Sequence, residues 1–417
     1  MTTVEAERVD GDVTRPTPRY LTTHHQRTGI RFRVFPQLRD LPDFDVPVTV
    51  WLDGSRGPIR PGPEDDAMYV VDAVDKLPYF SDGVQRGVPP YQRAVSGLRA
   101  TPDREGHFDQ IPPVASTARE FSCAAVYAAI RCTLMVWEHY LGRRVRWYFE
   151  KQFPRLEVIP RIQSGTAYSR PGYLECGHYE RRPLCDNLEI VSHEVGHIIV
   201  RAVMGHPGHP QAVEPRAREE AFADLAAMVT LLHFESMVSH LLRRTRGNLF
   251  SLNALSKVGE LSRKRTVRRA FNDSKLSTLK WDADQDKFKY ALAAPLTAAV
   301  FDVLVDIYER ALVRRRAIPA DVASASVGFV GEKLPAIQAE FAVHYRAKAA
   351  RFEDALLEGR DTVATLLART WERSSPYDLY PHVARTMIQA ATELGGRSLA
   401  RMVRDAFVFR HIMPAAG

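Results

Sequence analysis

Apolar residues are spaced in two different ways along this chain of 417 residues. Between residues 28 and 115 they form short alternating runs, for example at 30–35 and 46–51, and many prolines and glycines separate these runs. Such runs are typical of strands joined by long loops. At 117–142, 188–204 and 216–228, and almost throughout 295 to 411, apolar residues recur at helical spacing. We therefore predict an α+β protein with a β-rich N-terminal region and a mostly α-helical C-terminal lobe.

The chain accordingly divides into four predicted parts. Residues 1–18 are polar and charged without any period, so we expect a disordered tail there. The β-rich region covers 19–116, a central core covers 117–235, and the mainly helical lobe covers 236–417. Its first part, 236–290, is basic, and we expect it to be partly helical. Within the core, the pattern predicts a long helix at 117–142 and a strand at 155–159.

One predicted helix, at 188–204, is strongly apolar. Ile and Val dominate it and leave few polar interruptions, as expected for a helix buried in a domain core. Asp186 or Asn187 can cap its start, and Gly205, followed by Pro207, can end it. Polar groups in such a helix need a compensating partner, because burying them alone is unfavourable.

The polar positions of this helix form the motif His193-Glu194-Val195-Gly196-His197. Histidines four residues apart lie on one face of a helix, one turn from each other. Both imidazoles can therefore reach a single zinc ion, and Glu194 can act as a base on a water molecule at that ion. The alternative is a pair of hydrogen-bonded core histidines beside a surface glutamate, because so short a pattern also arises by chance.

A catalytic zinc ion takes three protein ligands and keeps one position open. A third histidine six residues after the second is ruled out, because that position is Val203. The helical segment 216–228 offers Glu220 and Asp224, which are four apart and share a face. We predict that Glu220 is the third ligand and that Asp224 accepts the second ring N–H of His193. By themselves the two acids would more simply form a solvated helix face, but their position after the histidine pair favours the metal site.

The two motifs resemble those of the gluzincin metallopeptidases, and among these the thermolysin-like group. The likeness rests on His193-Glu194-x-x-His197 and Glu220-Ala-Phe-Ala-Asp224, and it covers residues 117–305, most strongly at these motifs. It implies a thermolysin-like zincin fold, a zinc cofactor and a peptide or protein substrate. In this family a long helix, an edge strand and a short strand precede the zinc helix, and residues 165–169 and 172–177 stand at the places of the two strands.

The resemblance also implies where substrate binds. The edge strand of the family carries an Asn-Ala pair that forms hydrogen bonds to extended substrate. In this chain Ala167 matches the alanine, whereas Thr166 stands where the asparagine would be. Ala167 and its neighbour Tyr168 are therefore the candidates for substrate binding.

A second departure concerns the oxyanion of the tetrahedral intermediate, which the family stabilises with a histidine just before a later helix. Pro295 suits the first turn of that helix here. Tyr290 then stands at the histidine position, with Lys289 beside it. A phenol can donate a hydrogen bond to an oxyanion, but Tyr290 fits ordinary core packing equally well.

Composition narrows the possible partners. The net charge is +7, and basic runs occur at 243–244, 263–265, 268–269 and 314–316. Because no nucleic-acid-binding motif accompanies these runs, we favour solvated helix faces over a nucleic-acid partner. No apolar stretch of membrane-spanning length lacks charge, so we expect no membrane span. Nothing in the pattern predicts an oligomeric state.

The N-terminus lacks the apolar core of a signal peptide, which predicts a cytoplasmic protein. The cysteines are consistent with a reducing compartment. Cys123 and Cys132 lie nine residues apart in one predicted helix, too far from each other to form a disulfide. We expect Cys176 and Cys185 to be free thiols as well.

Three functional hypotheses follow. The first is a zinc-dependent peptidase, in which His193, His197 and Glu220 hold zinc and Glu194 serves as general base and then general acid. The second is a zinc-bound, non-hydrolytic scaffold for a peptide or protein partner. The missing oxyanion histidine favours it, whereas the intact Glu194 argues against it. The third is a cytoplasmic regulator that cleaves a DNA-bound repressor.

Overall fold

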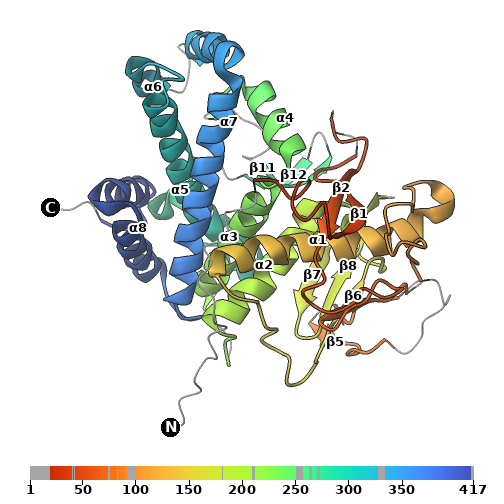
Figure 1. Ribbon diagram of the computed structural model, residues 1–417. Coiled ribbons are helices and arrows are strands. Elements are labelled where there is room, and N and C mark those ends of the chain that lie inside the picture. Colours follow the sequence, from red (N-terminus) through yellow and green to blue (C-terminus); the bar gives the residue numbers. More distant parts are fainter. Residues whose placement is uncertain are drawn as a thin grey trace.

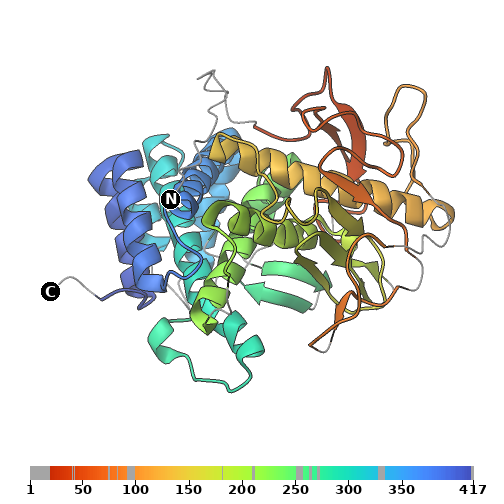
Figure 2. The same cartoon turned by 90° about the horizontal axis from the view of Figure 1, so that it is seen from below.

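The computed structural model describes residues 19–39, 41, 43–73, 76–81, 83–91, 99–180, 182–208, 212–249, 257–262, 265–269, 273–326 and 334–414. The tail predicted at 1–18 lies outside these residues. Within the described part, the protein has an α+β fold with a β-rich N-terminal region, a central core built around two adjacent helices, and a helical C-terminal part (Figures 1 and 2).

A four-stranded sheet lies beside the central helices. Its spatial order is β3 (Met68–Val70), β6 (Leu156–Ile159), β8 (Tyr173–Cys176) and β7 (Ala167–Arg170). The strands β3, β6 and β8 are parallel, whereas β7 pairs antiparallel with β8. The strand predicted at 155–159 and the two implied by the resemblance are confirmed, and β7 forms an edge of the sheet.

The N-terminal region contributes short strand pairs. In the hairpin of β1 (Ile30–Val34) and β2 (Val48–Leu52), alternate side chains are buried, and this face packs on helix α1. Alternation of this kind is the pattern that predicted strands there. The remaining strands and 3-10 turns are short: β4 (Phe80–Ser81), β5 (Val84–Gln85), β9 (His178–Tyr179), β10 (Arg182–Pro183), η1 (Ala115–Thr117), η2 (Leu184–Asp186) and η4 (Leu276–Thr278).

The helices of the core begin and end close to where the sequence predicts. Helix α1 (Ala118–Leu141) ends at Gly142, whose φ of 64° is left-handed. Helix α2 (Leu188–Met204) begins after Asn187, whose side chain accepts a hydrogen bond from the backbone N–H of Glu189 at 2.9 Å. It ends at Gly205, with a φ of 98°. Helices α3 (Val213–Leu231) and α4 (Glu235–Thr245) follow.

The C-terminal part is helical, as predicted. It contains α5 (Gln285–Arg314), α6 (Ala320–Ser326), α7 (Leu334–Glu372), which is bent at Lys348, and α8 (Tyr380–Phe409), which is bent at Gly395 and Gly396. Buried Arg218 of α3 joins this part to the core, because its guanidinium donates to the backbone carbonyls of Ser375, Pro376 and Asp378 at 2.6–3.0 Å.

The segment 236–290 differs from its prediction in one respect. Besides helical residues it contains an antiparallel hairpin of β11 (Lys257–Ser262) and β12 (Arg265–Arg269). The helix preference of Lys, Arg and Leu is a weak prior, and pairing between two short segments overrides it. The prediction of a partly helical segment therefore missed this hairpin.

The start of α5 corrects a second expectation. The helix begins at Gln285, ten residues before Pro295, because the side chain of Asp284 caps it by accepting from the backbone N–H of Lys287 at 3.2 Å. Pro295 therefore lies inside the helix rather than in its first turn. As a result, Tyr290 belongs to the helix itself and does not precede it.

The apolar interior is continuous between the core and the C-terminal helices. Trp137 of α1 and Trp371 of α7 lie with ring centroids 4.4 Å apart, and both are fully buried. By length and composition alone, Ala115–Leu141 and Gln285–Arg314 could cross a membrane, as could the bent pair α3 and α4 if it is counted as one span. The apolar windows of the first two are 89% and 72% buried inside the protein, so packing accounts for most of their apolar surface.

Candidate metal centre

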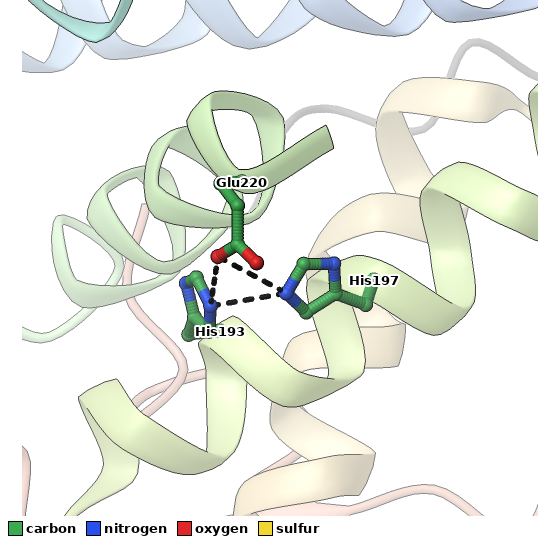
Figure 3. Close-up of side chains that lie close together, drawn as sticks. All are labelled: His193, His197 and Glu220. Carbon is green, nitrogen blue, oxygen red and sulfur yellow. Dashed lines mark hydrogen bonds and ion pairs between the residues drawn. The ribbon is translucent and has the colours of Figure 1, made fainter. Parts of the chain in front are cut away.

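A close approach of two helices builds the site. An added Cβ on Gly196 of α2 would lie 3.0 Å from Cα of Ala223 and 3.0 Å from Cβ of Ala226, both on α3. Because contacts this short crowd a Cβ, glycine lets the two helix backbones lie this close. The approach brings Glu220 of α3 opposite the histidines of α2 (Figure 3).

Three predicted ligand atoms meet between these helices. Nε2 of His193 lies 3.1 Å from Nε2 of His197, and Oε2 of Glu220 lies 3.5 Å and 3.6 Å from these two nitrogens. Figure 3 shows the carboxylate of Glu220 pointing from its helix toward both rings. The structure therefore brings together the group that the sequence predicted as a ligand set.

The dimensions of this triangle fit a zinc ion. In a tetrahedral site with bonds of about 2.0–2.1 Å, neighbouring ligand atoms lie about 3.3 Å apart. The three measured separations of 3.1, 3.5 and 3.6 Å lie on either side of this value. Two histidine nitrogens and one carboxylate oxygen are also one of the donor sets found in catalytic zinc sites.

The far nitrogens of both rings face carboxylates. Nδ1 of His193 lies 2.9 Å from Oδ1 of Asp224, and Nδ1 of His197 lies 2.9 Å from Oε1 of Glu219. Ionised carboxylates only accept hydrogen bonds, so each Nδ1 carries the proton. In the neutral rings, both Nε2 lone pairs then point toward the Glu220 carboxylate and toward each other, an arrangement that requires a cation or a proton between them.

The field of these carboxylates is strong enough to hold a positive charge. Burial opposes a charged imidazole, but the carboxylates of Glu220 and Glu219 together raise the pKa of His197 to about 10. Burial also acts to raise the pKa of Glu219, but the guanidinium of Arg201, 2.8 Å away, and the His197 ring lower it to about 2. Glu219 is therefore a carboxylate anion in the folded protein.

Sequence reasoning missed Glu219 and Arg201. A signal for Arg201 is present, since it continues the four-residue spacing of His193 and His197 along one face of α2. Glu219 directly precedes the predicted ligand Glu220, and only the packing of α3 against α2 shows which of these acids faces which nitrogen.

Lys289 contacts the proposed ligand Glu220. The sequence predicted its neighbour, Tyr290, as the site residue. Nζ of Lys289 lies 2.7 Å from Oε1 of Glu220. Burial acts to lower the pKa of Lys289, but the Glu220 carboxylate outweighs it and the pKa is raised, so the side chain is an ammonium ion. Tyr290 is 40% exposed, and its ring centroid lies 4.6 Å from the same ammonium. Its role as the oxyanion donor stays a prediction.

Glu194 contacts the edge strand through its backbone. It is 8% exposed, and its backbone carbonyl accepts a hydrogen bond from Oγ of Ser169 at 2.9 Å. Ser169 belongs to β7, so this bond ties the edge strand to the helix that carries both histidines. Ala167 and Tyr168 lie on the same strand, with Ala167 buried and Tyr168 partly exposed. Their role in substrate binding stays a prediction.

Comparisons with known proteins give matches among solved structures. No protein-family model and no curated protein matches the sequence. Among solved structures, the chain is similar to the precursor of protealysin, a metalloproteinase from Serratia proteamaculans, with a TM-score of 0.47 and 10% sequence identity. The match covers 82% of this chain and 87% of that chain. The metal centre is inferred from its own atoms and does not depend on this likeness.

Proposed function

We propose that this protein is a zinc-dependent peptidase. The observation that carries the proposal is the triangle formed by Nε2 of His193, Nε2 of His197 and Oε2 of Glu220, whose edges of 3.1–3.6 Å match a tetrahedral zinc site. Glu194 directly follows the first ligand in the same helix, which supports a hydrolytic role over a purely structural one.

Each side chain of the site has a separate role in peptide hydrolysis. Zinc, when bound, lowers the pKa of a water molecule and polarises a carbonyl group. Asp224 and Glu219 keep the two imidazoles in the tautomers that offer Nε2 as ligand atoms. Glu194 takes a proton from the attacking water and gives a proton to the leaving amine. Tyr290 is the proposed donor to the oxyanion.

The position of β7 supports a peptide as substrate. An edge strand offers backbone N–H and C=O groups to which an extended chain can add as a further strand. This strand lies beside α2, and the Ser169–Glu194 hydrogen bond holds the two elements together. Ala167 and Tyr168 would align substrate along this edge, near the proposed metal ion.

A glutamine at position 194 tests the proposal. Purified wild-type protein is expected to contain one zinc ion and to cleave members of a peptide library, and removal of zinc with a chelator should abolish cleavage until zinc is returned. Glu194→Gln should keep the zinc and lose at least ~100-fold in kcat/KM, because general acid–base groups contribute about that much or more. Glu150→Gln, at an exposed glutamate, is the matched control.

Two results would contradict the peptidase. If Glu194→Gln cleaves peptides as fast as the wild type, hydrolysis does not use this site. If the wild type holds one zinc ion but cleaves no peptide in the library, the non-hydrolytic scaffold is the better description. We also propose a cytoplasmic location, which is supported by the four cysteines, all of them buried free thiols.

A further inference from the structure

The two oxygens of Glu220 have different partners. Oε2 faces both histidine nitrogens at 3.5 and 3.6 Å, whereas Oε1 lies 2.7 Å from Nζ of Lys289. Lys289 comes from α5, a different element from those that carry the ligands, and its side chain is 19% exposed. The ammonium ion therefore lies one carboxylate away from the place of the proposed metal.

We propose that Lys289 is a positioning residue of the metal centre, which holds Glu220 as a one-oxygen ligand and lowers the affinity of the site for zinc. The inference rests on the proposed metal site and concerns a residue that the peptidase mechanism does not use. The ammonium bonds to Oε1, and Oε2 is the oxygen that faces both histidine nitrogens.

Electrostatics determines the sign of the effect. A charge of +1 next to a ligand carboxylate repels a divalent cation, and burial weakens the screening of this repulsion. The same ion pair neutralises part of the negative charge of Glu220, so the carboxylate donates less electron density to the metal. Zinc at this site would then bind more weakly and would keep more of its charge, which is the property that a Lewis acid requires.

A purely structural ion pair between α3 and α5 predicts the opposite result. If Lys289 only held Glu220 in place, its loss would loosen a ligand, and zinc would bind more weakly. If Lys289 opposes the metal, its loss makes zinc bind more tightly. The direction of the change in zinc affinity therefore separates the two roles.

The experiment measures zinc affinity of the full chain by competition with a chromophoric chelator at neutral pH. Lys289→Met keeps most of the length of the side chain and removes its charge, and we expect it to bind zinc at least tenfold more tightly than the wild type. Lys289→Arg keeps the charge and should stay within threefold of the wild type. Lys287→Met removes an equal charge from an exposed position of the same helix and should also stay within threefold.

Three outcomes would overturn the inference and leave the metal centre itself in place. Weaker zinc binding by Lys289→Met makes Lys289 a structural support, and unchanged binding shows that the ion pair has no influence on the metal. Tighter binding by Lys287→Met to the same extent would make the effect a general one of net charge. Absence of zinc binding by the wild type would instead remove the metal centre, and with it the proposed function. Thermal melting of each zinc-free variant verifies that it folds.

Discussion

Oε1 of Glu219 lies 2.9 Å from Nδ1 of His197, on the side of the ring that faces away from the proposed metal. The next residue, Glu220, faces Nε2 of the same ring. Two consecutive acids of α3 thus hold one imidazole from both sides. Arg201 binds Glu219 at 2.8 Å, so an arginine, a carboxylate and an imidazole form a chain that leads to the ligand nitrogen.

Glu219→Gln is expected to weaken zinc binding by about 10–100-fold, the usual effect of removing a partner that orients a metal-binding histidine. Nδ1 of His197 and the guanidinium of Arg201 both contact Oε1, so an amide oxygen there can still accept from each, but the negative charge is gone. Chelator competition measures the change, with Glu150→Gln as the exposed control. A zinc affinity within twofold of the wild type would show that Glu219 is not needed to orient His197.

Gly196→Ala should destabilise the protein and also weaken the metal site. The new Cβ would lie 3.0 Å from the backbone of Ala223, so α2 and α3 must move apart. Overpacking costs about 1–3 kcal/mol, whereas alanine recovers about 1 kcal/mol of helix propensity. We expect a net loss of about 1 kcal/mol in the free energy of unfolding of the zinc-free protein, with lower zinc affinity because Glu220 moves away from the histidines.

Denaturant unfolding and chelator competition measure these two effects. Gly54→Ala is the control, because nothing lies within 4 Å of an added Cβ there. A stabilised Gly196→Ala protein with unchanged zinc affinity would mean that the two helices are not held together as closely as the structure places them.

Asp306→Asn should stabilise the protein at pH 7 and have little effect at pH 4. Burial raises the pKa of Asp306 to about 6. The nearby carboxylate of Asp405 adds to this rise, and Arg310 opposes it. An unfolded aspartate titrates near pH 3.9, so between these values the folded state binds more protons and stability falls as pH rises. Asparagine lacks this ionisation, and we expect about 1–3 kcal/mol of added stability at pH 7.

Urea unfolding of wild type and Asp306→Asn at both pH values measures this difference. Asp405→Asn, at an exposed aspartate, should change stability much less at pH 7. An equal gain at pH 4 and pH 7 would point to packing or hydrogen bonding of the amide rather than to the loss of an ionised carboxylate.

Local spacing explains which features could be predicted from the sequence. Helix α2, its cap at Asn187 and its end at Gly205 follow from residues close together in the chain. The shared face of His193 and His197 is a property of any helix, because residues four apart lie one turn from each other. The start of α5 was missed because capping by Asp284 outweighed the preference of Pro295 for a first turn.

The sequence by itself determined which regions are mainly helical and which side chains could hold a metal, since helical periodicity and donor chemistry are local properties. Only the tertiary structure decided that Glu219 faces His197, that Lys289 reaches Glu220, and that β7 is tied to α2 through Ser169. These contacts join different elements, and their geometry depends on how closely the helices pack. The close packing of α2 and α3 depends on the contact between Gly196 and Ala223, which neither residue specifies alone.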